Sequence, residues 1–144
     1  MNGKLHHIEL YVDRLAEARE FWGWFLGWLG YELHQEWSDG FSYILEDTYI
    51  VFVRVAEKHR GLPYHRCRPG INHLAFHVDA RSDVDRLTAE LRTKGVTILY
   101  EDRHPFAGGE EHYAVYFEDP FRMKVEVVAE TQDSIRHPQT SDEL

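Results

Sequence analysis

The heptad His7-Ile8-Glu9-Leu10-Tyr11-Val12-Asp13 returns as His73-Leu74-Ala75-Phe76-His77-Val78-Asp79, at an offset of 73 − 7 = 66 residues. In both copies apolar and other residues alternate with a period of two, which is typical of a half-buried strand. Each copy opens with a histidine, so an internal duplication would bring two imidazoles to equivalent points of two strands. Two imidazoles that face each other are the start of a metal site.

The residues after each heptad predict the same order of elements, β-α-β-β-β. In the first copy Asp13 can cap a helix that runs to about residue 29, and strands are expected at 31–37, 41–46 and 48–55. In the second copy the stretch Ser82-Asp83-Val84-Asp85 reads as a capping box, and Gly95 ends the helix. Strands are then expected at 96–101, 111–118 and 122–129.

This repeat predicts an α+β fold of two βαβββ modules with their helices on the outside. The 144 residues suit one domain over residues 1–129, built from module one (4–56), a linker (57–70) and module two (71–129). Residues 130–144 form a polar tail, which we expect to be disordered or loosely docked.

Composition excludes several classes of function. A formal net charge of −9 disfavours binding to nucleic acid. No apolar stretch is long enough to span a membrane, and the first residues lack the apolar core of a secretory signal. A single cysteine, Cys67, excludes an internal disulfide and fits a reducing cytoplasm. We therefore expect a cytoplasmic protein without a nucleic-acid or membrane partner.

Side-chain parity predicts which residues share a face. Ile8, Leu10 and Val12 should pack under the helix, so His7, Glu9 and Tyr11 face away, and His73 and His77 face away in the second copy. In the last strand Glu126 faces away by the same rule. His7, His73 and Glu126 then form a set of two imidazoles and one carboxylate. Such a set suits Fe(II), Zn²⁺, Mn²⁺, Co²⁺ or Ni²⁺ and leaves positions open for water or substrate.

The far ends of the two modules also align. The stretch from Asp47 to Val55 matches the stretch from Asp119 to Val127 at an offset of 119 − 47 = 72. Under this alignment Arg54 stands where Glu126 stands, and a guanidinium cannot bind a metal ion.

Several neighbours of the predicted site are candidates for proton transfer. Glu9 shares the face of His7 and is a candidate base, although a salt bridge with an arginine is the alternative. His77 lies one strand period beyond His73 and can carry a proton, unless it is a hydrogen-bonded core histidine. Tyr116 can hydrogen-bond an oxygen at the metal, or it can pack into the core.

Other neighbours are candidates for substrate binding. Arg54 can hold an anionic group, or it can form an ion pair at the end of the sheet. Tyr11 shares the face of His7. His112 lies beside the Gly108-Gly109 loop, which is either a lid over the site or an ordinary surface loop.

Three stretches of the chain resemble the vicinal oxygen chelate superfamily, which includes glyoxalase I, fosfomycin-resistance proteins, methylmalonyl-CoA epimerase, extradiol dioxygenases and bleomycin-binding proteins. They are His7 to Asp13 followed by Ala18-Arg-Glu-Phe21-Trp22, then His73 to Asp79, and Tyr116 to Glu126. The resemblance covers residues 4–129. It implies two βαβββ modules in a U-shaped, barrel-like mixed sheet, metal ligands at His7, His73 and Glu126, and pairing into homodimers.

The resemblance leaves more than one function open. The first is an enzyme that uses a divalent metal ion (Zn, Mn, Fe, Ni or Co) to chelate vicinal oxygens of a small substrate, for lyase, isomerase or epoxide-opening chemistry. The second is an Fe(II) extradiol-type dioxygenase. The third is a metal-free protein that binds a small molecule such as a drug.

Overall fold

The computed structural model of the chain describes residues 1–129. It divides into two compact units, Met1–Pro63 and Tyr64–Leu144, and the described part of each is treated by itself. The predicted tail at 130–144 lies outside the described residues. Within residues 1–129, no helix is both long enough and apolar enough to cross a membrane.

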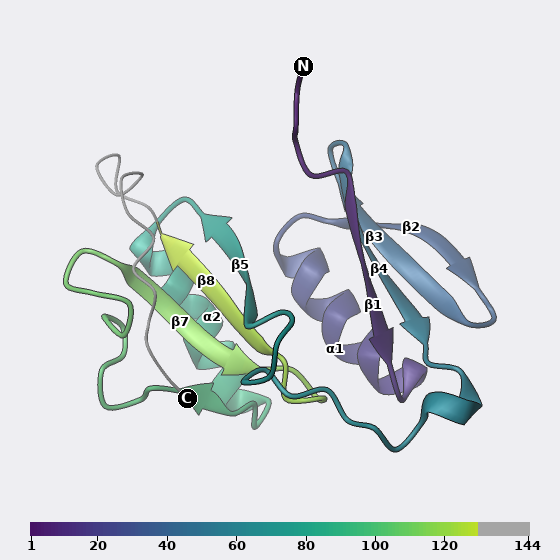
Figure 1. Cartoon of the computed structure of the whole chain (residues 1–144). Coiled ribbons are helices and arrows are strands. Elements are labelled where there is room, and N and C mark those ends of the chain that lie inside the picture. The colour runs from purple at the N-terminus through teal and green to yellow at the C-terminus, as the bar shows by residue number, and fades with distance from the viewer. Residues whose placement is uncertain (130–144) are drawn as a thin grey trace. The chain divides into compact units, whose positions relative to one another are not determined.

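The first unit has the predicted βαβββ order (Figure 1). Its elements are β1 (His7–Val12), α1 (Leu15–Trp28), β2 (Glu32–Trp37), β3 (Gly40–Leu45) and β4 (Thr48–Arg54), followed by the short 3-10 helix η1 (Glu57–His59). The strands form one sheet in the order β1-β4-β3-β2, in which β1 is parallel to β4 and the other neighbours are antiparallel.

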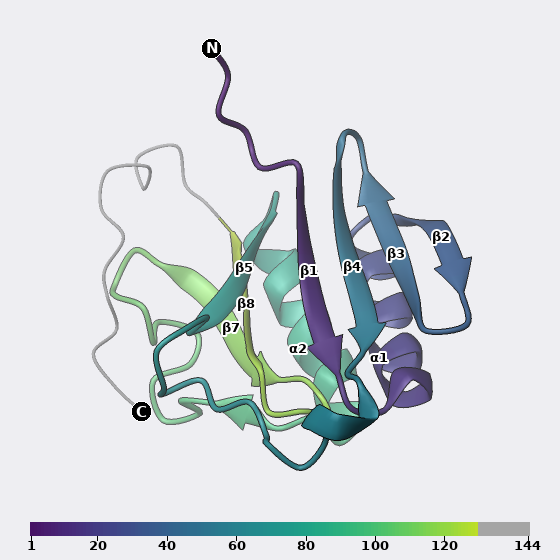
Figure 2. The ribbon, with the colours of Figure 1, turned by 45° about the vertical axis from the view of Figure 1, so that its right-hand side comes forward.

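The second unit repeats this arrangement (Figures 1 and 2). Its elements are β5 (His73–Val78), α2 (Arg81–Thr93), β6 (Ile98–Leu99), β7 (Tyr113–Glu118) and β8 (Lys124–Ala129). The sheet order is β5-β8-β7-β6, with β5 parallel to β8. The α+β class and both βαβββ modules are confirmed. Within residues 1–129 the eight strands belong to two four-stranded mixed sheets and not to one closed sheet.

Each helix covers one face of its own sheet. In the first unit the rings of Trp22 (α1) and Phe52 (β4) lie 5.0 Å apart, and Leu10 and Val12 are buried on β1. In the second unit α2 buries Val84, Leu87 and Leu91 completely. The sheet below it buries Val115, Phe117, Val125 and Val127 just as completely. Each such aliphatic side chain contributes roughly 1.5–3 kcal/mol relative to exposure, so this face fixes the register of the strands.

Both helix starts differ from the prediction. The N-cap of α1 is Arg14 and not Asp13, and it makes no side-chain cap. Helix α2 begins at Arg81, ahead of the expected capping stretch, because the Asp83 carboxylate accepts the backbone N–H of Ala80 at 3.1 Å. Asp83 therefore stands at the third helical position and not at the start.

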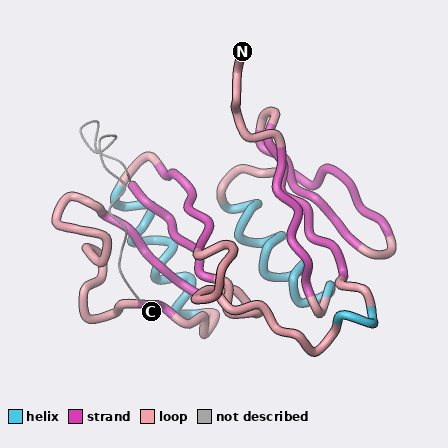
Figure 3. Tube along the Cα trace, in the orientation of Figure 1, coloured by secondary structure: helices cyan, strands magenta, loops and turns pink. Residues whose placement is uncertain are grey.

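The expected strand at 96–101 is reduced to Ile98–Leu99, and an irregular segment follows it. Tyr100 has a left-handed φ of 56°, which ends the strand. Its carbonyl accepts the N–H groups of Arg103 and His104, each at 2.9 Å. Figure 3 shows the resulting loop between β6 and β7. We call residues 100–112 the β6–β7 segment.

Candidate functional site

The carboxylate of Glu126 is the centre of a polar cluster in the second unit. Strand β8 lies between β5 and β7, and Glu126 is paired with Ala75 on one side and Tyr116 on the other. Paired residues of neighbouring strands share a face of the sheet. Val125 and Val127 pack on the helix side, so Glu126 and Tyr116 lie on the opposite face, as the sequence predicts.

A turn between β7 and β8 sets this register. The Asp119 carboxylate accepts the backbone N–H groups of Phe121 and Met123, both at 2.8 Å. Asp119 is itself 7% exposed, so these bonds are largely shielded from water. The turn therefore fixes where β8 begins, and with it the position of Glu126.

Three side chains converge on Glu126, which is 4% exposed. Nε2 of His73 lies 3.0 Å from Oε2, and Nε2 of His112 contacts Oε1. Tyr116 pairs with Glu126 across β7 and β8, and each of the two groups shifts the pKa of the other. The structure thus brings together four of the predicted site residues, namely His73, His112, Tyr116 and Glu126.

These contacts determine the charge of the carboxylate. Burial raises the pKa of Glu126, but the hydrogen bonds from His112 and His73 outweigh it and lower the pKa to about 2. For Tyr116, burial and the nearby charge of Glu126 raise the pKa far above that of a free phenol. At neutral pH Glu126 is therefore an anion and Tyr116 a neutral hydrogen-bond donor.

The β6–β7 segment lies directly on this cluster. A Cβ atom added to Gly108 would lie 2.8 Å from the Tyr116 hydroxyl and would overlap the His112 ring. A side chain at this position would therefore force the His112 ring, the Tyr116 hydroxyl or the segment itself to shift. The segment closes over Glu126 from the side that carries His112.

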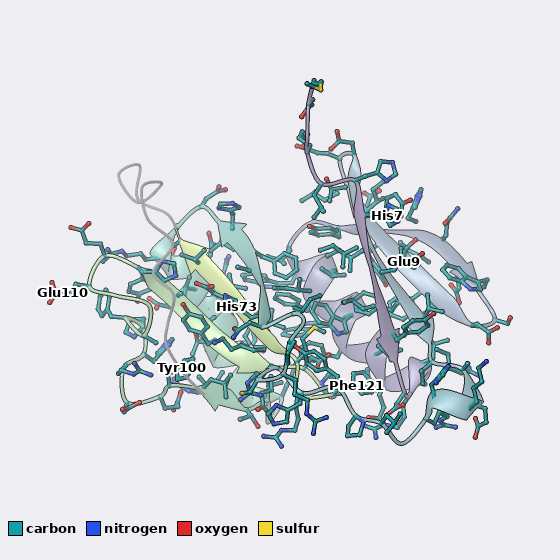
Figure 4. All side chains as sticks on the ribbon, in the orientation of Figure 1. His7, Glu9, His73, Tyr100, Glu110 and Phe121 are labelled. Carbon is teal, nitrogen blue, oxygen red and sulfur yellow. The ribbon has the colours of Figure 1, made fainter. Side chains whose placement is uncertain are left out.

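Module one carries the other predicted ligand. His7, Glu9 and Tyr11 are exposed and alternate with Leu10 and Val12, which are buried, as predicted. The His7 ring stacks on Tyr49 at 4.8 Å, and its Nδ1 lies 2.8 Å from Nδ1 of His6. Figure 4 labels His7 and Glu9 along β1, and His73 and Tyr100 in the second unit.

The equivalence between Arg54 and Glu126 is wrong. His7 pairs with Tyr49 and His73 pairs with Lys124, so the second pair of strands is offset by 124 − 49 = 75 residues and not by 72. Val51 is therefore the counterpart of Glu126. Arg54 pairs with Val12, which is buried under α1, so its place in the register is on the helix side of the sheet.

His77 lies on the same face of β5 as His73 and is exposed. It pairs with Val128, whereas Glu126 pairs with Ala75. No hydrogen bond or ion pair between His77 and Glu126 is among the contacts of the described residues. The role of His77 as a proton carrier stays a prediction.

Two further residues on this face were not predicted from the sequence. Lys124 is 2% exposed, and its Nζ lies 2.9 Å from the hydroxyl of Tyr100. A signal for Lys124 was present, because it precedes Glu126 by two residues and so shares its face. No local pattern indicates Tyr100, which reaches the sheet through an irregular turn.

The donor atoms present fit a divalent cation in part. His73 and Glu126 supply one nitrogen and one ionised oxygen, and the other ring nitrogen of His73 lies 2.7 Å from Asn72 Oδ1, which can hold the ring in place. Within residues 1–129, no three His, Cys, Asp or Glu side chains already surround one point. The trio His7, His73 and Glu126 draws on both units and stays a prediction.

Paired βαβββ modules with a histidine at the start of each first strand and a carboxylate on the last strand define a class of protein. The chain belongs to the Glyoxalase/Bleomycin resistance protein/Dioxygenase superfamily, whose model matches residues 4–127. This confirms the family that the sequence indicates.

Individual relatives agree with this assignment. The uncharacterized protein YqjT of Bacillus subtilis (strain 168) is 54% identical over 125 residues, which cover 87% of this chain and 98% of YqjT. A solved structure of a candidate glyoxalase from Bacillus halodurans is 55% identical, with a TM-score of 0.87, and the match covers 89% of this chain and 96% of that one.

A more distant neighbour was solved with a metal ion. The fosfomycin resistance protein FosX of Listeria monocytogenes, complexed with Mn(II) and sulfate, is 21% identical with a TM-score of 0.65. The match covers 92% of this chain and 94% of FosX. At this identity the likeness shows a shared fold.

Proposed function

We propose that this protein is a mononuclear divalent-metal enzyme of the glyoxalase family, in which His7, His73 and Glu126 hold the ion. Its substrate would be a small molecule that presents two adjacent oxygens. The observation that carries the proposal is the buried Glu126 carboxylate, whose pKa is lowered to about 2 and which faces Nε2 of His73 at 3.0 Å. A cation in this place would be bound by both atoms.

The surroundings of the proposed ligands favour an ion with open positions. Two imidazoles and one carboxylate suit Zn²⁺, Mn²⁺, Fe²⁺, Co²⁺ or Ni²⁺. Val51, the counterpart of Glu126 in module one, is an apolar residue and can supply no fourth ligand. A set of three ligands leaves room for substrate, as catalytic metal sites require.

The bound metal would act as a Lewis acid that stabilises developing negative charge on a substrate oxygen, an effect of several kcal/mol. The protein's own groups have separate tasks. Tyr116 stays protonated beside Glu126 on the neighbouring strand. His112 can accept or return a proton at Nε2 beside the same carboxylate, and Glu9 is an exposed candidate base on the face of His7. This set serves lyase, isomerase or epoxide-opening chemistry.

The remaining expectations belong to the same proposal. The proposal includes a small-molecule substrate and pairing into homodimers, which the family resemblance implies, and a cytoplasmic location, which the single cysteine suggests. Nucleic acid is not expected as a partner, since no basic surface is indicated by this composition.

Metal-dependent stabilisation tests the proposal. Protein purified without chelator would be analysed for metal, stripped, and then melted with Mn²⁺, Fe²⁺, Co²⁺, Ni²⁺ or Zn²⁺. An ion present at about 100 times its Kd stabilises the folded state by about 2.7 kcal/mol, so the preferred ion should stand out. His7→Ala and His73→Ala should each lose the shift, while His59→Ala, an exposed histidine of η1, should keep it.

The same samples separate the other functions. If no ion stabilises the wild-type protein and none co-purifies, the metal-free binding protein is favoured and the proposal fails. Anaerobic loading with Fe²⁺ followed by catechols and air tests the dioxygenase. Ring cleavage under these conditions would mean that the protein is a dioxygenase and not a lyase or isomerase.

A further inference from the structure

Lys124 is a buried cation that the proposed chemistry does not use. It is the first residue of β8, pairs with His73 on β5, and shares a face with Glu126 two residues later. Only 2% of its surface is exposed. Lysine is rarely buried to this extent unless its charge is compensated, because an ammonium loses its hydration there.

The compensation comes from two tyrosines. Nζ of Lys124 donates to the Tyr100 hydroxyl at 2.9 Å. It also lies 5.1 Å from the centre of the Tyr100 ring and 5.4 Å from the centre of the Tyr116 ring. Within residues 1–129 no carboxylate lies within ion-pair distance of this ammonium. The hydroxyl of Tyr100 and the electron-rich ring of Tyr116 thus compensate the charge.

Tyr100 connects this contact to the β6–β7 segment. It is the residue at which the segment starts, and its φ of 56° is unfavourable for any residue other than glycine. Its carbonyl accepts the N–H groups of Arg103 and His104, so its conformation sets the first turn of the segment. A strained residue of this kind persists only where the surroundings hold it.

Tyr116 connects the same contact to the carboxylate. Its ring lies 5.4 Å from that of Tyr100, and it pairs with Glu126 across β7 and β8. The Gly108 backbone lies directly against Tyr116 and His112. The segment is therefore fastened at its start by Lys124 and at its end by the contact of His112 with Glu126.

We infer that Lys124 is a positioning residue, whose ammonium holds Tyr100 and Tyr116 and thereby places His112 on Glu126. The inference rests on the proposed function in one respect, because that function makes Glu126 a metal ligand. The contacts themselves exist in the metal-free protein, so they can be tested without any metal or substrate.

Hydrogen exchange on the metal-free protein tests this role. Lys124→Met keeps the length of the side chain and removes its charge. We expect the amides of Arg103, His104 and Ala114, whose hydrogen bonds hold the segment, to exchange at least ten times faster than in the wild-type protein. The other amides of β5, β7 and β8 should exchange at the wild-type rate. Lys124→Arg keeps a cation that can donate to Tyr100 and lie on Tyr116, and should restore most of the protection. Lys58→Met, at an exposed lysine of η1, is the matched control.

Nuclear magnetic resonance supplies a readout that a general loss of stability would not give. In the wild-type protein the methylene protons next to Nζ of Lys124 should be shifted upfield by the Tyr116 ring, and the His112 ring should show nuclear Overhauser contacts to Gly108 and Tyr116. These contacts should vanish in Lys124→Met and return in Lys124→Arg. Tyr100→Phe, which keeps the ring and removes the acceptor, should show an intermediate loss.

Three results would overturn the inference. They are uniform acceleration of exchange over the whole second unit, unchanged exchange in Lys124→Met, and wild-type Lys124 methylene protons at ordinary positions. The last measurement needs no variant, so it holds even if Lys124→Met fails to fold. Failure of the proposed function would appear separately, as an absent metal-dependent shift in a protein whose segment behaves as expected.

Discussion

His73 and Glu126 meet across two parallel strands, with Nε2 of the imidazole 3.0 Å from Oε2 of the carboxylate. They lie 126 − 73 = 53 residues apart in the chain, and the pairing of β5 with β8 brings them together. The carboxylate is buried, whereas 28% of the His73 side chain remains exposed. The pair is thus anchored on the side of Glu126 and open to solvent on the side of His73.

The charge of Glu126 should be essential for metal-dependent stabilisation and not for folding. Glu126→Gln keeps the shape and removes the anion, so the stabilisation by the preferred ion should fall to nothing in a thermal melt. The matched control is Glu111→Gln, at an exposed glutamate next to His112, which should keep the full shift. A variant Glu126→Gln that still responds to the metal would show that the ion binds elsewhere.

A side chain at Gly108 should destabilise the protein. In Gly108→Ala the new methyl group would meet the Tyr116 hydroxyl and the His112 ring, and relief of that overlap costs about 1–3 kcal/mol. We expect a lower midpoint in urea unfolding. Gly27→Ala provides the contrast, because no atom lies within 4 Å of the added Cβ in helix α1. That variant should be more stable by about 0.5–1 kcal/mol. Equal effects of the two changes would mean that the segment does not press on the site.

The backbone at Arg122 offers a stabilising substitution. Its φ of 66° is left-handed, which costs roughly 1–2 kcal/mol for a residue with a Cβ. Its guanidinium lies 3.7 Å from Glu118 and is 73% exposed, so this ion pair contributes little. Arg122→Gly should therefore raise the free energy of unfolding by about 0.5–1 kcal/mol, after the entropy cost of glycine.

The control for Arg122→Gly is the replacement of a glycine by alanine at a position with a similar backbone conformation. Gly95 has a φ of 73° after helix α2, and no atom lies within 4 Å of an added Cβ. Gly95→Ala should lower the free energy of unfolding by about 1 kcal/mol, because the left-handed backbone alone penalises it. Chemical denaturation of both variants measures the two signs. The same sign in both would refute this explanation.

Much of the cluster around Glu126 could be predicted from the sequence, because side chains alternate between the two faces of a strand. Alternation along β5 and β8 places His73, Lys124 and Glu126 on the face away from the helix, and the structure agrees. The histidine that completes the cluster is different. His112 reaches Glu126 from an irregular segment, whose path depends on the left-handed Tyr100 and on space left by Gly108. Such contacts between distant residues leave no local pattern.

The alignment that equated Arg54 with Glu126 is wrong because the two modules have turns of different length. It matched the turns at Asp47 and Asp119. In module one Leu45 pairs with Thr48, which leaves two residues in the turn, whereas Glu118 pairs with Lys124 and leaves five. The difference, 5 − 2 = 3, is the gap between the offsets of 72 and 75. Turn length is a property of the backbone, and an aspartate can begin either turn.

The stability of the second unit should depend on pH through His104. Burial, followed by the nearby charge of Arg92, lowers the pKa of His104 below its ordinary value of 6.5. The folded state then binds fewer protons than the unfolded state between that lowered pKa and 6.5. The contribution of His104 is therefore complete above pH 6.5 and is lost as the pH falls through the folded-state pKa.

His104→Gln, which cannot take up a proton, isolates this effect. We expect the wild-type protein to lose stability relative to the variant as the pH is lowered from 7 to 5, in urea melts of the metal-free protein at constant ionic strength. His59→Gln, at an exposed histidine of η1, should follow the wild-type curve over the same range. Parallel curves for wild type and His104→Gln would mean that the imidazole is as well hydrated in the folded chain as in the unfolded one, and that the β6–β7 segment does not shield it.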